Sequence, residues 1–240
     1  MSATHAEALV AAMAAELRDG DVVATGVASP LAVLAIAVAR ATHAPRLTYL
    51  CCVGAVDPEV RRLHPSSEDL AYLGGRRAEL SIPDLFDHAR RGRIDTIFFG
   101  AAEVDAAGRS NMSATGSISR PAVKLPGVAG AAALRRWVRR PVLVMPRQTR
   151  RNLVERVQVA STIDIRPTPL LTDLGRFEVG GAGAVLRAHR PWTTPAEVAE
   201  RTGFAFAVAD DLATDAAPHP ATLEAIRAID PDNLREQLVG

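Results

Sequence analysis

The sequence predicts an α/β protein built on an open, largely parallel sheet with flanking helices. Apolar segments of strand length alternate with segments of helical spacing. A glycine lies in the first turn between a strand and an apolar helix, as in parallel strand–helix–strand units. The 240 residues carry 48% hydrophobic and 23% charged side chains, enough apolar surface for a substantial core. We therefore expect a single domain over residues 1–240.

The amino-terminal part contains the clearest strand–helix–strand unit. Residues 6–18 have helical spacing, and DVVATG at residues 21–26 is typical of a buried strand. Ser29 and Pro30 are suited to the N-cap and first position of the next helix, PLAVLAIAVARAT. Residues 47–52 form the following strand. This order predicts parallel pairing of the two strands.

Both cysteines stand at the end of the second strand. Cys51 and Cys52 are expected to be thiols, because a bridge between adjacent cysteines strains the chain. Side chains alternate along a strand, so the two thiols are predicted to point to opposite faces. Ligands of parallel sheets bind where strands end and helices begin, which places Gly26 and Gly54 at a predicted binding edge.

The later elements follow the same alternation. Residues 61–79 are expected to run over the surface, and residues 83–90 to form a helix that begins at Ser81 or Pro83. The remaining predicted elements are strands at 94–100, 141–146, 153–160 and 203–209, a strand pair within 170–179, a turn at 180–183, a helix beginning with the capping box Thr194–Glu197, and a helix at 220–228.

The segment GAAEVDAAGRSNMSATG follows the strand at 94–100 and is the most patterned part of the chain. Glu103 adds a carboxylate where the apolar strand stops, and residues 105–108 have the composition of a turn. Asn111 and Ser113 then bring small hydrogen-bonding side chains back to the same edge. The segment is a candidate site, although a plain Asp-Gly turn has the same composition.

Charge and composition exclude several classes of protein. The net charge of +1, from 28 basic and 27 acidic residues, argues against binding of nucleic acid or an anionic membrane. The arginine pairs 135–136 and 139–140 and the run 147–151 are most simply a solvated surface. Acidic residues near the amino terminus argue against a signal peptide, so a cytoplasmic location is expected. Two cysteines alone make neither a disulfide scaffold nor a complete zinc site, and no metal is expected.

The ordered motifs resemble a known family. DGDVVATGVASPLAVLAIAVARATHAP resembles the opening strand, turn and helix of the β subunit of family I coenzyme A transferases, of the glutaconate CoA-transferase type. The segment that begins at Gly100 resembles the family signature G-A-x-Q-V-D-x-x-G-N-x-N-x-S. TDLGRFEV, HRPWTTPAEVAERTGFAFAV and IRAIDPDNLR resemble the carboxy-terminal blocks. The resemblance covers nearly the whole chain, with its blocks in order.

The resemblance implies a partner and a substrate class. Family members pair with a homologous α subunit, as αβ or α2β2, and act on acyl-CoA thioesters between the subunits. Coenzyme A is then a part of the substrate and not a permanent cofactor. Residues at the matching positions for coenzyme A are Gly26, Gly54, Ala102, Asn111 and Ser113.

Two departures from the family pattern bear on the chemistry. The family's catalytic glutamate lies in a short E-S-G or E-N-G motif, and placing Gly54 on the motif glycine puts Cys52 on the glutamate. The glutamine of the signature is replaced by Glu103, so an amide donor becomes an acceptor. Classical transfer through a glutamate of this chain is therefore not expected.

Three interpretations remain open. In the favoured one the chain belongs to a hydrolase, including ring-opening carbon–carbon cleavage, in which Glu103 or a carboxylate of the α subunit activates water. In the second, Cys52 replaces the glutamate as the nucleophile of a true transferase, although a plain core cysteine is the simpler interpretation. In the third, the chain is a non-catalytic structural subunit.

Overall fold

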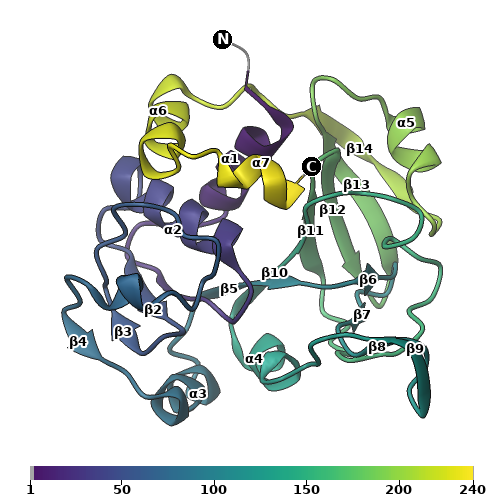
Figure 1. The fold of residues 1–240 in the computed structure, drawn as a ribbon. Coiled ribbons are helices and arrows are strands. Elements are labelled where there is room, and N and C mark those ends of the chain that lie inside the picture. The colour runs from purple at the N-terminus through teal and green to yellow at the C-terminus, as the bar shows by residue number, and fades with distance from the viewer. Residues whose placement is uncertain (1–2, 240) are drawn as a thin grey trace. The chain divides into compact units, whose positions relative to one another are not determined.

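The computed structural model describes residues 3–239, which form two compact units. The first unit runs to Phe98 and also contains the short piece Trp137–Pro141 and the chain from Ala217 onward. The second unit contains Phe99–Arg136 and Val142–Ala216. Figure 1 shows the helices and strands of both units. Within residues 3–239 no helix is both long and apolar enough to cross a membrane.

The sheet of the first unit contains the predicted parallel pairing. β1 (Val22–Ala24) pairs in parallel with β2 (Thr48–Cys51) on one side and with β5 (Thr96–Gly100) on the other. β3 (Ala55–Val56) continues the sheet antiparallel to β2, and β4 (Ala78–Glu79) lies antiparallel to β3. The α/β class is confirmed, and the ends of β1 and β2 meet at one edge.

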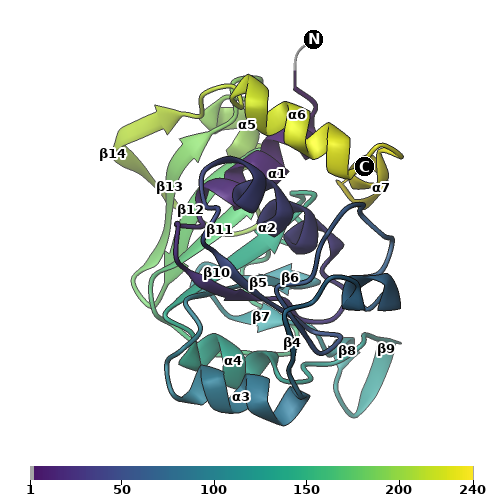
Figure 2. The same ribbon diagram turned by 90° about the vertical axis from the view of Figure 1, so that its left-hand side faces the viewer.

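Helices bury the apolar residues of the first unit. α2 (Pro30–Thr42) is buried along its whole amino-terminal part, because its residues are apolar on every face. It packs against α1 (His5–Ala15) and α6 (Pro220–Ile229), as Figures 1 and 2 show. Ser29 is its N-cap by position, as predicted, but the Ser29 hydroxyl donates to the Val27 carbonyl at 3.0 Å instead of capping the helix. The other helices of this unit are η1 (Leu70–Leu73), α3 (Ile82–Arg90) and α7 (Leu234–Val239).

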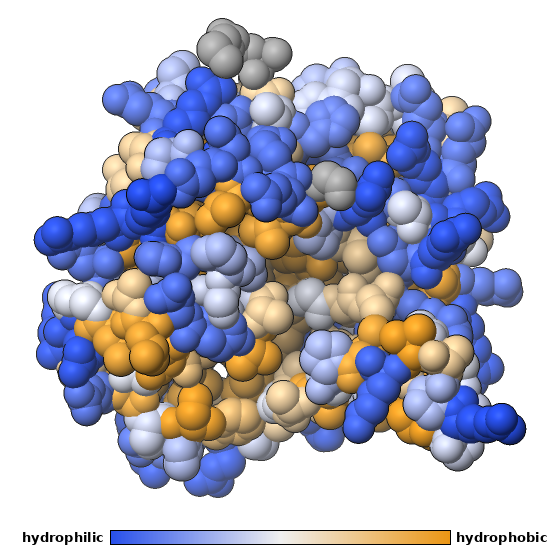
Figure 3. Space-filling view, in the orientation of Figure 1, coloured by the Kyte–Doolittle hydropathy of each residue, from blue (hydrophilic) through white to orange (hydrophobic). Residues whose placement is uncertain are grey.

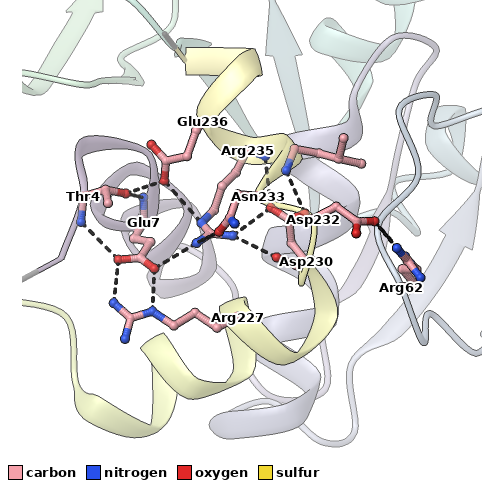
Figure 4. A network of polar contacts seen from close by, with 10 residues as sticks. Thr4, Glu7, Arg62, Arg227, Asp230, Asp232, Asn233, Arg235 and Glu236 are labelled. Carbon is pink, nitrogen blue, oxygen red and sulfur yellow. Dashed lines mark hydrogen bonds and ion pairs between the residues drawn. The ribbon is translucent and has the colours of Figure 1, made fainter. Parts of the chain in front are cut away.

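A buried carboxylate joins α1 to the two carboxy-terminal helices (Figure 4). Glu7 is only 1% exposed, and its two oxygens accept from Arg227 Nε and Nη2 at 2.7 and 3.0 Å. Arg235, itself 3% exposed, donates from Nη2 to Glu7 at 3.0 Å and from Nη1 to Asp230 at 2.9 Å. The hydrogen bond from Arg227 lowers the pKa of Glu7, although burial opposes this. The carboxylate is therefore charged and fully paired at neutral pH.

The strands of the second unit pair in both parallel and antiparallel directions. β10 (Arg140–Met145) and β11 (Thr168–Thr172) pair in parallel. β12 (Gly175–Gly180) and β13 (Gly183–His189) extend the sheet antiparallel, and β14 (Ala207–Thr214) then pairs in parallel with β13. The smaller elements are β6 (Glu103–Val104), β7 (Ser110–Asn111), β8 (Ala114–Ser117), β9 (Arg120–Lys124), α4 (Ala131–Trp137) and α5 (Pro195–Glu200). The predicted capping box of Thr194 and Glu197 begins α5.

Two strand predictions are corrected by the structure. Residues 153–160 form no strand: Leu153 makes only an isolated bridge to Val104, and the backbone N–H of Gln158 donates to the Glu103 carboxylate at 2.8 Å. The predicted strand at 203–209 starts only at Ala207. Before that point, Phe204 and Phe206 pack their rings edge-on against Phe177. In both segments tertiary contacts replace the local strand preference.

The surface mixes polar and apolar side chains. Figure 3 shows hydrophilic residues over much of one face, with hydrophobic ones gathered in patches between them. Large apolar side chains that remain exposed in the first unit are Val27, Leu70, Ile82 and Leu238. Those of the second unit include Ile118, Val123, Ile163 and Ile165.

Candidate functional site

Cys52 lies in the turn between β2 and β3, directly after the end of β2. Gly54 closes this turn through its N–H, which donates to the Cys51 carbonyl at 3.0 Å. Gly54 has φ +99°, and an added Cβ would stand 3.1 Å from the Leu80 carbonyl oxygen. A side chain is therefore disfavoured at Gly54, which explains why the motif ends in glycine.

Cys51 and Cys52 lie in different environments at the end of β2. The alternation of β2 stops at Cys51, which is fully buried, and Cys52 is half-buried in the turn. The Cys52 thiol donates to the Ser67 carbonyl with an Sγ–O distance of 3.4 Å. The neighbouring Cys51 and burial raise the pKa of Cys52. Cys52 is therefore the thiol that keeps its proton.

Polar groups from the end of β1 complete this edge of the first unit. The Tyr49 hydroxyl, on a fully buried ring, lies 3.0 Å from the Thr25 hydroxyl. Burial raises the pKa of Tyr49, so the phenol stays neutral. Gly26 follows Thr25, and an added Cβ at Gly26 would meet nothing within 4 Å. The edge thus presents a thiol and hydroxyl groups in their neutral forms.

In the second unit the predicted turn is the tip of a short hairpin. Glu103 and Val104 of β6 pair with Asn111 and Ser110 of β7. The Asp105 carboxylate accepts from Arg109 N at 3.1 Å and from Arg109 Nε at 2.8 Å. These bonds hold the turn closed, so Asp105 and Arg109 act here as a structural pair.

Glu103 is the centre of a buried hydrogen-bond network. Glu103 is only 3% exposed, and its carboxylate accepts hydrogen bonds from three donors. Asn111 Nδ2 and Gln158 N lie 2.9 and 2.8 Å from Oε2, and Gln158 Nε2 lies 2.6 Å from Oε1. Asn111 is fully buried and also binds the backbone of Ala114 through both ends of its amide. Most of the hydrogen-bonding capacity of these two side chains is used within the unit.

Two more predicted residues lie beside this network. The Ala102 N–H donates to the Asn111 carbonyl at 2.9 Å, which continues the hairpin. The Ser113 hydroxyl lies 2.6 Å from the Ser161 hydroxyl. The seven predicted site residues thus fall into two groups: Gly26, Cys52 and Gly54 in the first unit, and Ala102, Glu103, Asn111 and Ser113 in the second. Their predicted roles toward coenzyme A stay predictions.

Arg135 corrects the expectation of a solvated arginine surface. It is fully buried, and its Nη1 donates to the Thr162 hydroxyl at 2.8 Å. Burial lowers the pKa of Arg135 to about 10, so it remains charged at neutral pH. Its Nη2 would lie 3.3 Å from a Cβ added at Gly108, whose φ is +78°. Glycine at position 108 therefore allows both the left-handed turn and the close packing of the buried Arg135 guanidinium.

Replacing Gly108 by alanine is expected to destabilise the chain by about 1–3 kcal/mol, because a left-handed conformation and a crowded Cβ combine at one position. Urea unfolding followed by circular dichroism measures this. Gly92→Ala is the matched control: φ there is +66° and an added Cβ meets nothing within 4 Å. If Gly108→Ala lowers the free energy of unfolding no more than Gly92→Ala does, Arg135 imposes no extra constraint on a side chain at position 108.

Several residues that shape these two groups are not found by reasoning from the sequence. Its pattern places Gln158 in a strand, and Ser67 and Glu68 in a surface excursion. Tyr49 and Thr25 have the pattern of ordinary buried-strand residues. A tyrosine and a threonine at adjacent strand ends are only a weak indication of a functional site, and nothing in the sequence around Gln158 indicates its contact with Glu103. Among residues 3–239 no three histidine, cysteine, aspartate or glutamate side chains gather as metal ligands would.

An α/β chain whose polar groups gather at strand ends has the architecture of enzymes that bind ligands along a sheet edge. The family model described as Coenzyme A transferase matches residues 6–201. The chain belongs to the coenzyme A transferase family and is an enzyme subunit of it. The predicted family is thereby confirmed.

Three similar proteins show the range of chemistry near this chain. A solved structure of the decarboxylase AibA/AibB is 65% identical, with a TM-score of 0.97 and 99% of each chain covered. Solved variants of the same complex carry one cysteine replaced by valine, alanine, serine or asparagine. The B-type chain of the 3-oxoadipate CoA-transferase of Pseudomonas knackmussii is 29% identical over 93% of this chain and 92% of its own length. The cholesterol ring-cleaving hydrolase IpdB subunit of Mycobacterium tuberculosis is 28% identical over 98% of each.

Proposed function

We propose that this chain is the B-type component of a two-subunit decarboxylase that acts on a CoA thioester carrying a second, free carboxylate. The observation that carries the proposal is the 65% identity to AibA/AibB over 99% of both chains. The partner is a homologous A-type chain, as in that complex. The 3-oxoadipate relative, whose named substrate is a dicarboxylic acid, supports a dicarboxylic acyl group.

The state of Cys52 favours decarboxylation over acyl transfer. A transferase needs a strong nucleophile on this strand end, and a protonated thiol is a weak one. A protonated thiol is, however, suited to donate a proton. In the proposed reaction the bond between the carboxylate carbon and the acyl chain breaks, carbon dioxide leaves, and the electron pair passes to carbons conjugated with the thioester carbonyl. Cys52 then gives its proton to the resulting enolate carbon and regains one from water.

Hydrolysis is the second candidate. The identity to the IpdB subunit and the buried carboxylate of Glu103 favour it. Three donors already hold the Glu103 oxygens, which leaves little capacity for an attacking water. In the decarboxylase proposal Glu103 is a positioning residue that orients Asn111 and Gln158. Its role as a water-activating base remains a prediction.

The experiment compares three products in one assay. The chain is co-expressed with its A-type partner, and the purified complex is incubated with glutaconyl-CoA, labelled in the free carboxylate. Decarboxylation releases labelled carbon dioxide and leaves an acyl-CoA that is shorter by that carbon. Free coenzyme A without labelled carbon dioxide would identify a hydrolase, and transfer to added acetate a transferase. Acetyl-CoA, which lacks a second carboxylate, is the control substrate.

Replacing Glu103 by glutamine is expected to destabilise the chain by about 1–3 kcal/mol, because an amide accepts through one oxygen only and cannot satisfy all three donors. Thermal unfolding of the complex measures this loss. Decarboxylation per folded complex should fall less than about tenfold if Glu103 only positions its neighbours. Complete loss of decarboxylation in a folded Glu103→Gln complex would show that Glu103 does more than position its neighbours.

A further inference from the structure

Ser67 connects the two strand ends of the first unit. It is fully buried, although it lies in a polar stretch of the sequence. Its carbonyl accepts the Cys52 thiol at 3.4 Å. Its hydroxyl accepts from Ser29 N at 3.0 Å and lies 3.3 Å from the Gly26 carbonyl oxygen. The position of Ser67 thus determines where the Cys52 S–H points.

Glu68 holds this connection in place. Its Oε1 accepts from Ala28 N at 2.7 Å, in the turn after β1. Its Oε2 accepts from the Ser66 hydroxyl at 2.6 Å and lies 3.1 Å from the Ser67 hydroxyl. Burial opposes the charge of Glu68, but the hydrogen bonds from Ser66 and Ala28 outweigh it and lower the pKa of this carboxyl. Glu68 is therefore an ionised carboxylate at neutral pH.

The neighbouring Cys51, burial and the negative charge of Glu68 all raise the pKa of the Cys52 thiol, whose S–H donates to the Ser67 carbonyl. The titratable groups that face Cys52 are Cys51, Tyr49, Tyr72 and Glu68. Tyr49 and Tyr72 stay neutral because burial raises the pKa of each, that of Tyr72 to about 12. A fixed carboxylate on this side opposes a thiolate at Cys52, whereas a hydrogen-bond acceptor at its S–H favours the thiol.

We propose that Glu68 is a positioning residue that keeps Cys52 protonated and directs its S–H through Ser67. The inference deepens the proposed decarboxylation and rests on it for its catalytic meaning, because a proton donor must hold its proton when the enolate forms. The protonation of Cys52 itself can be measured without any turnover.

The test measures the pH dependence of Cys52 alkylation in the intact two-subunit complex. Iodoacetamide reacts with the thiolate, so its rate at each pH reports the thiolate fraction. Mass spectrometry of the peptide that holds both cysteines, with fragmentation between them, separates Cys52 from Cys51. Glu68→Gln keeps the shape and one acceptor oxygen but removes the charge. We expect alkylation of Cys52 below its pKa to become about three- to tenfold faster.

Two variants and one condition make the result decisive. Asp69→Asn removes the same charge from the adjacent residue, and the new amide oxygen can still accept from Ala71 N, as the Asp69 carboxylate does at 2.8 Å; we expect no change in Cys52 alkylation. Glu68→Asp keeps the charge on a shorter side chain, so its effect on Cys52 alkylation should be smaller than that of Glu68→Gln. If Glu68→Gln fails to fold, rising ionic strength on the native complex should accelerate alkylation in the same direction.

The outcomes separate this inference from the proposed function. Equal alkylation of Cys52 in the native and Glu68→Gln complexes, or an equal change in Asp69→Asn, would overturn the role of Glu68. A faster alkylation in Glu68→Gln, in a complex that releases no carbon dioxide, would leave the role of Glu68 standing and overturn the decarboxylase. If the role of Glu68 and the proposed decarboxylation are both correct, the Cys52 thiol of Glu68→Gln loses its proton at a lower pH. The decarboxylation rate of that variant should then begin to fall at a lower pH than that of the native complex.

Discussion

Cys52→Ala is expected to lower carbon dioxide release from glutaconyl-CoA by about a hundred- to ten-thousandfold, the usual contribution of a positioned acid. Alanine removes the proton donor and leaves the enolate to be protonated by water. The fold should survive, because Cys52 is half-buried in a turn and its thiol donates only a weak hydrogen bond to Ser67. Cys52→Ser should keep that hydrogen bond but remain slow, since a hydroxyl is a much weaker acid than a thiol.

Measurements of product and of protein mass distinguish this role from the alternatives. Turnover in deuterated water should place deuterium on the carbon that lost the carboxylate. Incubation of the native complex with substrate should give no acyl adduct on Cys52, whereas an adduct would restore the nucleophile interpretation. Cys51→Ala is the matched control, and it should shift the pH profile through the pKa of Cys52 rather than abolish turnover. Full activity of Cys52→Ala would remove Cys52 from the mechanism.

Glu7→Ala is expected to destabilise the first unit by about 3–5 kcal/mol, because it leaves a buried guanidinium without its partner. Arg235 is 3% exposed and would keep only Asp230 and its near neighbours as acceptors. Urea unfolding of the complex measures the loss. The matched control is Glu236→Ala: Glu236 also contacts Arg235, at 3.4 Å, but its side chain is 40% exposed. A change below about 0.5 kcal/mol is expected there, and an equal loss in the two variants would contradict the argument.

The stability that Glu7 contributes should depend on pH in a definite direction. Its pKa in the folded chain is lowered, so the unfolded chain binds a proton more readily. The contribution is therefore complete above the unfolded pKa of about 4.3 and is lost as the pH falls through the folded value. Unfolding curves of the native chain and of Glu7→Gln, taken from about pH 7 to about pH 3, should converge toward acid. Curves that stay parallel would place the effect in packing and not in the charge.

Local chemistry accounts for the part of the fold that was correctly predicted. The apolar helix that begins after Ser29 and the capping box at Thr194 depend on residues a few positions apart, so their signals lie within short windows. The turn at 105–108 needs only an aspartate, a glycine and the backbone between them. The order of the family's motifs then supplied the family, which the match over residues 6–201 confirms.

The sequence by itself determined the α/β class, the placement of helix ends and turns, and the position of Cys52 at a strand end. Only the tertiary structure decided what surrounds each functional group. Gln158 reaches Glu103 across 55 positions, and Arg235 reaches Glu7 across 228. Hydrogen bonds over such separations leave no periodic signal, because their geometry exists only after the strands and helices have packed. The protonation of Cys52 also depends on the tertiary structure, since Cys51, burial and the neighbouring Glu68 together raise its pKa.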